Sequence, residues 1–409
     1  MKIAVMGCGT VGSGVVDIID SKKDLMVKST GEEIEVKYIL DIRDFTGSPL
    51  ASRIVKDIDI IVNDEEIGTV VETMGGVEPA FTFCKKCLEK GKNVVTSNKA
   101  LVAAKAEELF KAARENNAAF MFEASVCGGI PLIRTMFSSL SANNIMSFAG
   151  ILNGTTNFIL TKMINEKMSF DQALKIAQEK GYAEKDPTAD IEGLDAGRKT
   201  AILASIAYGT HVYPEEIHTE GITGVTLEDA AYAASENYKI KLLGKAQRLE
   251  NGKKGAIVCP FFVNEESLIS GVNGVYNAIS ITGDSIGDVL LYGQGAGKEA
   301  TASAVVGDVM ECARVKKNEN HYCWDDHKEN SIEDYLLYET ALYVRGYAKD
   351  AESSIINIRE AFGGVKVLTK ENAAENEIAF ITDKATEKEL RETLSELRDF
   401  APASIIRIF

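Results

Sequence analysis

Short apolar runs alternate with amphipathic helical stretches over roughly the first 130 residues. The first apolar run covers 2–6 and leads directly into a glycine-rich turn. Comparable runs lie in four later segments: 31–45, 58–76, 92–103 and 118–133. Strands that alternate with helices predict βα units and a parallel sheet. Because such a sheet binds its ligand at the carboxyl ends of the strands, the residues after each run are the first candidates for function.

The pattern changes after about residue 132. Residues 196–209 have the composition of a buried helix, and 255–281 alternate as strands do, so we expect a mixed sheet with helices on one face. A polar, charged stretch at 316–334 is expected to be a linker. The last segment, 335–409, has the order strand, helix, strand, strand, helix, strand, which predicts a ferredoxin-like α+β domain.

A glycine-rich turn follows the first apolar run and precedes a helical pattern. This strand, turn and helix form the context in which G-x-G-x-x-G binds a dinucleotide. The glycines let the backbone approach a pyrophosphate, and the helix N-terminus offers N–H donors to it. The sequence therefore predicts a Rossmann-type dinucleotide-binding domain over 1–130, completed by about 293–315. Its expected cofactor contacts are Gly7, Gly9, Thr10, Val11 and Gly12.

Later strand ends add candidates for the same site. Asp41 and Arg43 close the second strand, where a carboxylate favours NAD and an arginine favours the 2′-phosphate of NADP. Strand alternation gives both side chains the same facing, so the pattern leaves both cofactors open. If the strand ends at Leu40, Asp41 meets the ribose first, and if it runs on to Ile42, Arg43 does. We expect NADP to be accepted through Arg43, with NAD also used. Thr73 ends another strand, and Lys99, after the next, is expected to face the nicotinamide.

Five carboxylates crowd into 184–195, directly after a helix that Gly181 ends. Asp195 begins a long helix on which Lys199, four residues later, shares its face. A short loop that concentrates carboxylates and then presents a lysine is costly unless it binds something. The alternative is a solvated acidic loop with one surface ion pair.

The stretch 177–199 resembles the signature of homoserine dehydrogenases along its whole length. The matching residues are Ala177, Gly181, Tyr182, Asp186, Pro187, Asp190, Gly193, Asp195 and Lys199. The string VVTSNKAL at 94–101, the NGTTN turn at 153–157 and the loop that ends at Gly297 also resemble family segments. The resemblance implies NAD(P)-dependent reduction of L-aspartate 4-semialdehyde to L-homoserine, reversibly, in threonine, methionine and isoleucine biosynthesis. It also implies that Gly297 returns the chain to the cofactor and that 131–292 form the substrate and dimerisation domain.

This reaction assigns chemical roles to the acidic loop. Aldehyde reduction needs a proton for the developing alkoxide, and Lys199 is the expected acid–base group. The helix N-terminus and burial are both expected to lower the pKa of its ammonium. Asp195 would orient the lysine or the substrate hydroxyl. The remaining expected pocket residues surround the same loop: Glu184 and Asp190 for the substrate ammonium, with Tyr182, Gly154 and Thr155.

Two further family features are expected. Glu123, Val126, Gly128 and Ile130 resemble the segment that wraps a monovalent cation, such as Na+, through backbone carbonyls, although these glycines could equally form a hinge. The segment 335–409 resembles an ACT domain, a common amino-acid-sensing module. Its first strand lacks the Pro-Gly of the sensing variants, so weak or absent threonine inhibition is expected, and its deletion is expected to leave an active enzyme.

Charge and composition narrow the class of protein. A net charge of −16 argues against nucleic acid and anionic membrane surfaces as partners. No apolar stretch approaches the roughly 18 residues of a membrane span. Seven cysteines without an export signal indicate a reduced, cytoplasmic setting. The family resemblance implies a small-molecule substrate and a homodimer or larger homo-oligomer. We expect Cys84 and Cys87 to be free thiols, and metal binding by His321, Cys323 and His327 is a minor alternative.

Two other functions fit part of the pattern. A dehydrogenase of another amino acid, such as aspartate, would keep the glycine loop but gives no reason for the 177–199 pattern. A non-catalytic sensor of nucleotides and amino acids would have no need of Lys199. Nicotinamide-dependent turnover of homoserine separates all three.

Overall fold

The computed structural model describes residues 1–314, 322–325 and 332–409. The chain forms two compact units. Unit 1 comprises Met1–Asn144, Ala201–Tyr213 and Gly293–Glu329, and unit 2 comprises Ile145–Thr200, Pro214–Tyr292 and Asn330–Phe409. Among the described residues, no helix combines the length and apolar character that crossing a membrane requires.

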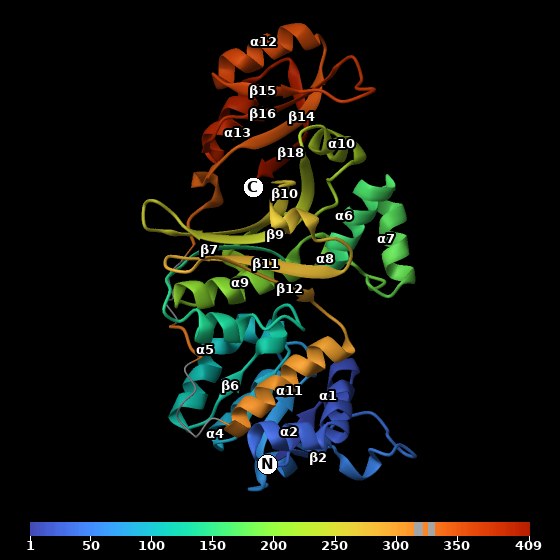
Figure 1. Cartoon of the computed structure of the whole chain (residues 1–409), viewed down its shortest axis with the longest axis vertical. Coiled ribbons are helices and arrows are strands. Elements are labelled where there is room, and N and C mark those ends of the chain that lie inside the picture. The colour runs from blue at the N-terminus through green and yellow to red at the C-terminus, as the bar shows by residue number, and fades with distance from the viewer. Residues whose placement is uncertain (315–321, 326–331) are drawn as a thin grey trace. The chain divides into compact units, whose positions relative to one another are not determined.

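Unit 1 is built on a six-stranded parallel sheet in the order β3-β2-β1-β4-β5-β6. Figure 1 labels β2 and β6 of this sheet and the helices α1, α2, α4, α5 and α11. The strands are β1 (Lys2–Met6), β2 (Glu35–Leu40), β3 (Ile54–Val55), β4 (Ile67–Glu72), β5 (Asn93–Thr96) and β6 (Phe120–Met121). The helices are α1 (Thr10–Ser21), α2 (Lys23–Thr30), α3 (Ile58–Val62), α4 (Ala80–Glu89), α5 (Lys99–Glu115) and α11 (Lys298–Arg314). The predicted Rossmann-type domain is confirmed.

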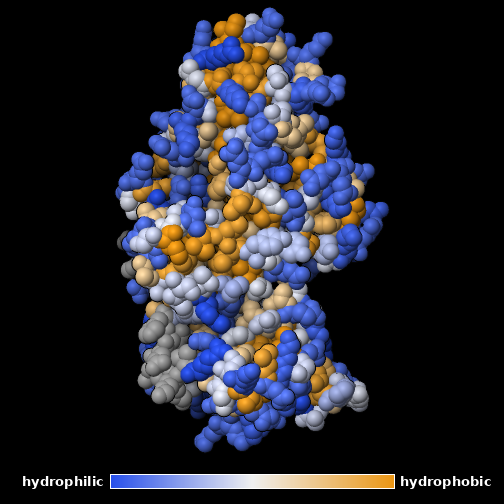
Figure 2. Space-filling view, viewed as in Figure 1, coloured by the Kyte–Doolittle hydropathy of each residue, from blue (hydrophilic) through white to orange (hydrophobic). Residues whose placement is uncertain are grey.

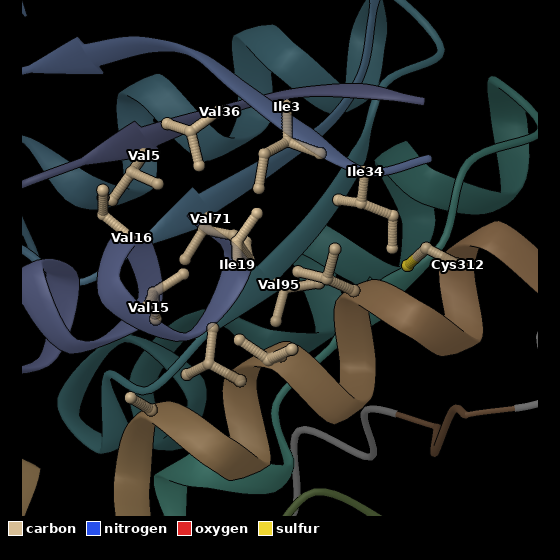
Figure 3. Packing of buried hydrophobic residues seen from close by; sticks show 14 of the residues in the cluster. Ile3, Val5, Val15, Val16, Ile19, Ile34, Val36, Val71, Val95 and Cys312 are labelled. Atoms are coloured by element: carbon tan, nitrogen blue, oxygen red, sulfur yellow. The ribbon is translucent and has the colours of Figure 1, made fainter. Parts of the chain in front are cut away.

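The core of unit 1 lies between the sheet and the helices α1 and α11. Apolar residues recur in α1 every three or four positions, so Val15, Val16 and Ile19 lie on one buried face. Figure 3 shows these side chains with those of Ile3 and Val5 from β1, all pointing into one cluster. A Cβ built on Gly14 would lie 3.0 Å from the Cβ of Ala302, so α1 and α11 pack closely. This packing fixes the start of α1 over the carboxyl end of β1.

Unit 2 contains a mixed sheet with the main strand order β12-β11-β7-β9-β10-β18-β14-β16-β15. The strands from the middle of the chain are β7 (Ile145–Ile151), β8 (His218–Thr219), β9 (Tyr238–Arg248), β10 (Lys254–Asn264), β11 (Tyr276–Gly283) and β12 (Gly287–Gln294). The helices are α6 (Gly154–Glu166), α7 (Phe170–Glu179), α8 (Thr188–Ile191), α9 (Leu194–Tyr208) and α10 (Leu227–Ser235). The predicted mixed sheet is confirmed.

The last part of unit 2 has the predicted strand and helix order. Its elements are β14 (Leu342–Ala348), α12 (Ala351–Phe362), β15 (Val365–Leu368), β16 (Glu377–Thr382), α13 (Glu387–Glu396) and β18 (Phe400–Ile408), with a small pair β13 (Glu339–Thr340) and β17 (Ala385–Thr386). Their antiparallel order β18-β14-β16-β15 is ferredoxin-like. The sheet does not stop there, because β18 also pairs in parallel with β10, Phe261 opposite Arg407. This continuous sheet was not predicted, because the pairing of β10 with β18 joins strands that are far apart in the sequence.

Candidate active site

The glycine loop of unit 1 has the geometry of a phosphate cradle. The Gly7 N–H donates to the Leu40 carbonyl at 2.8 Å, and Gly7 has a left-handed φ of +89°. A Cβ on Gly12 would lie 1.9 Å from the Gly7 oxygen, so only glycine lets α1 start this close to the strand. A Cβ on Gly9, the N-cap of α1, would meet no atom within 4 Å. The loop therefore leaves space at the helix N-terminus, and these residues fit a pyrophosphate.

The loop after β4 holds the glycine loop in place. The Thr73 hydroxyl donates to the Gly7 carbonyl at 2.7 Å, and its N–H donates to Met6 O at 2.9 Å. The buried Glu72 carboxylate accepts hydrogen bonds from the Thr96 hydroxyl (2.5 Å) and the Met74 N–H (2.7 Å). Burial raises the pKa of Glu72. Thr73 thus holds the glycine loop through its hydrogen bonds to Gly7 and Met6, and Glu72 joins the carboxyl ends of β4 and β5.

Asp41 and Arg43 bond to each other at the end of β2. The guanidinium donates to both carboxylate oxygens, at 3.0 and 2.6 Å, and the Cys8 N–H donates to the carboxylate at 2.8 Å. The Arg43 hydrogen bond holds the pKa of Asp41 well below its usual range. The Asp41 side chain is 6% exposed and that of Arg43 is 56% exposed. Asp41 therefore anchors the glycine loop, while Arg43 is the accessible member of the pair.

Lys99 and Gly297 begin helices of unit 1. Lys99 is the first residue of α5, after β5, and Asn98 caps this helix by accepting from the Leu101 N–H at 3.1 Å. Because β1, β4 and β5 are parallel, Lys99 lies at the same sheet edge as the glycine loop. Gly297, with a φ of +122°, directly precedes α11.

The segment 123–134 is held by two buried carboxylates. Glu123 accepts the N–H groups of Leu132, Ile133 and Arg134 at 2.6 to 2.9 Å, and burial raises its pKa. Asp308 accepts from the Glu123 N–H and the Arg134 guanidinium, and burial together with the Glu123 charge raises the pKa of Asp308 to about 7. The Glu123 side chain thus caps a turn. In the described segments, no group of three or more His, Cys, Asp or Glu residues could hold a metal ion.

Gly128 belongs to a close backbone contact. A Cβ on Gly128 would lie 2.8 Å from the Gly295 oxygen, and the Gly129 N–H donates to Gln294 O at 3.0 Å. The Ile130 N–H donates to Cys127 O at 2.8 Å. These glycines therefore pack the loop before α11 against the segment expected to bind a cation.

Unit 2 brings a lysine and two carboxylates together. Lys199 Nζ lies 2.7 Å from Asp195 Oδ2 and 2.8 Å from Leu152 O, and both side chains are buried. Asn153 Nδ2 donates to Asp195 Oδ2 at 2.9 Å and to Asp190 Oδ1 at 2.7 Å. Burial raises the pKa of Asp190. Lys199 thus belongs to a buried hydrogen-bond network with Asp195, Asn153 and Asp190.

Asn153 is the residue that sequence reasoning missed as a site residue. Asn153 caps α6 by accepting from the Thr156 N–H at 2.8 Å. Its amide nitrogen faces the other way, into the carboxylates. Its position in the NGTTN turn, which resembles a family segment, could have indicated that Asn153 belongs to the site.

The remaining predicted substrate residues lie around this cluster in two environments. The Thr155 hydroxyl donates to Tyr182 O at 2.7 Å, and a Cβ on Gly154 would lie 2.6 Å from Val275 O. The Tyr182 ring is 43% exposed and meets Phe158 edge-on. Glu184, in contrast, is exposed in the loop that precedes α8. The structure thus ties Gly154, Thr155 and Tyr182 to the buried cluster and leaves Glu184 outside it.

Other candidate features lie apart from this chemistry. A cavity of about 770 Å³ in unit 1 is lined by Met1, Ile67 and Asn93, at the amino ends of the strands, so it is opposite the glycine loop. Cys84 and Cys87 are buried free thiols with raised pKa values, as predicted. In the minor metal alternative, Cys323 is an exposed free thiol, and His321 and His327 lie outside the described residues.

Two family models match the chain. The homoserine dehydrogenase NAD-binding domain matches residues 7–123, and the homoserine dehydrogenase model matches 131–310. The homoserine dehydrogenase of Helicobacter pylori is 40% identical over 408 residues, covering 98% of this chain and 96% of the relative. That of Bacillus subtilis is 35% identical over 413 residues, covering 98% and 95%.

Solved structures agree with the sequence matches. The crystal structure of a homoserine dehydrogenase from Thiobacillus denitrificans has a TM-score of 0.90 at 35% identity, covering 100% of this chain and 98% of the other. A hyperthermophilic archaeal homoserine dehydrogenase in complex with NADPH has a TM-score of 0.64 at 32% identity, covering 76% and 98%. The chain belongs to the homoserine dehydrogenase family.

Proposed function

We propose that the protein catalyses the reversible, nicotinamide-dependent interconversion of L-homoserine and L-aspartate 4-semialdehyde, within amino-acid biosynthesis. The observation that carries this is the cluster of Lys199, Asp195, Asp190 and Asn153 in unit 2. It lies in a chain whose unit 1 has the fold and glycine loop of a nicotinamide-binding domain.

The cluster supplies the proton transfer that the reaction needs. The bound nicotinamide exchanges a hydride with the substrate carbon. In the reductive direction, the Lys199 ammonium donates its proton to the developing alkoxide; in the oxidative direction, the amine removes the hydroxyl proton. Asp195 holds Nζ at 2.7 Å, and Asn153 fixes Asp195. A lysine held by a carboxylate and a carbonyl is oriented before substrate arrives, which lowers the entropic cost of reaching the transition state.

The carboxylates would bind the amino-acid end of the substrate. The substrate α-ammonium needs anionic partners. The candidates are Asp190, which lies in α8, and Glu184, which lies in the loop before α8. Thr155 and Tyr182 join this loop to α6, and Gly154 lets the first turn of α6 pack closely against the Val275 carbonyl. Asp190 is the stronger candidate of the two carboxylates, because Asn153 holds it against the cluster.

Cofactor selectivity is assigned to Arg43. Its guanidinium is 56% exposed, whereas Asp41 is engaged by the glycine loop, so a 2′-phosphate has a cation to meet at this strand end. The archaeal neighbour with NADPH supports the same direction. NAD would also be used, because the glycine loop would bind the pyrophosphate that both cofactors share. Lys99 would face the nicotinamide.

We infer a cation site, an ACT-like domain and a cytoplasmic location from the family resemblance and from single features of the chain. Backbone carbonyls of Glu123, Val126, Gly128 and Ile130 would hold a monovalent cation, such as Na+. The C-terminal βαββαβ segment would be an ACT-like domain with weak or absent threonine inhibition, since Asp350 caps α12 by accepting from Ser353 N–H where sensing variants have a Pro-Gly loop. The enzyme would work in the cytoplasm.

Unit 2 would also carry a homodimer interface. Figure 2 shows an apolar area over β11 and β12, the latter at the sheet edge. Tyr276 and Tyr292 are exposed on these strands and stack at 5.2 Å. A large exposed apolar area is typical of a protein interface.

One assay tests the function. The purified chain is mixed with NADP or NAD and, separately, with L-homoserine, L-aspartate or no substrate, and formation of the reduced nicotinamide is followed. We expect turnover with homoserine alone. Turnover of aspartate in place of homoserine would establish the other dehydrogenase, and nucleotide binding without any turnover would establish the sensor.

A further inference from the structure

Arg407 joins the last strand of the chain to two carboxylates of unit 2. On β18 it is 3% exposed, and its guanidinium donates to both oxygens of Glu220 at 2.9 Å. The same group donates to both oxygens of Glu387 at 2.7 Å. An arginine in two bidentate pairs has little freedom to move, because each pair fixes the plane of the guanidinium.

Glu220 is held from a second side. His218 Nε2 lies 2.7 Å from Glu220 Oε1, and the His218 ring stacks on Tyr335 at 3.6 Å. Burial alone would raise the pKa of Glu220, but hydrogen bonds from His218 and Arg407 lower it to about 2. Glu220 is therefore ionised at every pH at which the enzyme would be assayed.

The backbone next to Glu220 packs against the acidic loop. The Ile222 N–H donates to the Ile191 carbonyl at 2.8 Å, and a Cβ on Gly221 would lie 2.1 Å from the same oxygen. Gly193, with a φ of +79°, is so close that its Cβ would lie 3.1 Å from Glu220 O. Ile191 and Gly193 lie between Asp190 and Asp195, so 219–222 support the loop that carries both carboxylates.

We propose that Arg407 is a positioning residue for the dehydrogenase reaction, fixing Glu220 and the 219–222 segment and thereby the placement of Asp190 and Asp195. The inference rests on the proposed function, because the loop matters only if this cluster is catalytic. It assigns a task to the C-terminal segment other than ligand sensing. The last strand of the chain thus holds the acidic loop, which carries Asp190 and Asp195, in the geometry that the reaction needs.

Arg345 provides a matched control in the same C-terminal segment. On β14 it is also 3% exposed, and its Nε donates to the buried Asp229 at 2.7 Å. Its Nη2 donates to Thr226 Oγ1, at the N-cap of α10, and its Nη1 donates to the Tyr347 hydroxyl and lies 3.7 Å from Glu377 Oε1. Arg345 therefore ties the segment to α10 through a comparably buried ion pair, whereas Arg407 ties it to 219–222.

The test compares Arg407→Gln, Glu220→Gln and Arg345→Gln in the full chain. For each we would measure kcat, the KM values for homoserine and NADP, and thermal unfolding, with kinetics at a temperature where all variants are folded. We expect kcat to fall by about tenfold or more in the first two, because small misplacements of reacting groups are costly. The KM for NADP should not change. Arg345→Gln should lose stability yet keep most of its kcat.

Equal losses of kcat in Arg407→Gln and Arg345→Gln, or an unchanged kcat in Arg407→Gln, would overturn the inference. If Arg407→Gln does not fold, Arg407→Lys keeps the charge without the planar fork and should show an intermediate loss. Native-state hydrogen exchange of the Ile222 amide gives a readout without activity. It should speed up in the Arg407 and Glu220 variants and not in Arg345→Gln. A parent chain without homoserine turnover would refute the proposed function, and exchange would still decide whether Arg407 holds the loop.

Discussion

Two buried lysines flank the turn at 152–157 in unit 2, and their partners differ. Lys199 on α9 contacts Leu152 O and the Asp195 carboxylate. Lys241 on β9, 2% exposed, contacts neutral oxygens: Asn157 Oδ1 at 3.2 Å, Asn273 Oδ1 at 3.3 Å and the Val272 carbonyl. Burial lowers the pKa of Lys241 to about 8.

The difference shows that burial alone does not identify an acid–base group. Lys199 is linked through Asp195 and Asn153 to Asp190, a carboxylate suited to a cationic substrate. Lys241 is linked to the 272–273 segment, where its hydrogen bonds hold a loop against α6. We therefore assign catalysis to Lys199 and a structural role to Lys241, and each assignment can be tested separately.

The largest expected effect is on the first lysine. Lys199→Met should lower kcat by about 10² to 10⁴, the usual contribution of a general acid–base group. NADP affinity, measured by titration calorimetry, should be retained because unit 1 is untouched. Lys241→Met serves as the matched control and should lose far less kcat. Comparable losses in the two variants would remove the distinction between the lysines.

The second prediction concerns stability and pH. Lys241 has a pKa of about 8 when folded and an ordinary value of 10.5 when unfolded. Between these values the unfolded chain binds more protons, so this group makes stability rise as pH increases from about 8 to 10.5. The unfolding free energy of the parent, minus that of Lys241→Met, should rise by something on the order of 3 kcal/mol across this window. Denaturant titrations check it; a flat difference would mean an ordinary lysine.

A smaller effect is expected at the edge of the lysine cluster. Glu184→Gln should raise the KM for homoserine by roughly fivefold, since an exposed ion pair contributes at most about 1 kcal/mol. Glu192→Gln is a control at an exposed carboxylate of the same loop and should leave KM unchanged. Steady-state kinetics decide; equal changes would show a general charge effect of the loop.

The smallest change in KM is expected in unit 1, at the ion pair of Arg43 and Asp41, whose arginine is exposed to solvent. Arg43→Ala should raise the KM for NADP by about threefold, in the range of a partly exposed charge contact, and leave that for NAD nearly unchanged. Arg53→Ala, which breaks a pair with Asp20, is the control. If both cofactors respond equally, Arg43 acts only by holding Asp41 in the glycine loop.

Local signals made part of this site predictable. The glycine spacing after β1 predicted the phosphate-binding loop. The four-residue separation of Asp195 and Lys199 predicted that their side chains lie next to each other. Asn153 lies 37 and 42 residues from its two carboxylates, and no periodicity carries such a contact. The predicted shared facing of Asp41 and Arg43 required a strand that continues past Leu40, but β2 ends at Leu40 and the two side chains bond to each other.

The C-terminal segment shows the same limit at the level of the fold. Its strand and helix order could be predicted from alternation, but pairing of β18 with β10 joins distant strands and has no local signature. Tyr343 also stacks on Phe262 at 4.3 Å. Removal of 335–409 would therefore uncover a strand edge and apolar rings, which is a physical reason against the expectation that the truncated chain stays active.

The central claim is that Lys199 and Asp195 act as one acid–base unit on homoserine. A double-mutant cycle on kcat with Lys199→Met, Asp195→Asn and the double variant tests it most directly. Groups that act together are strongly non-additive, so the double variant should lose no more kcat than the worse single variant. Losses that multiply would contradict the account, because each residue would then contribute independently.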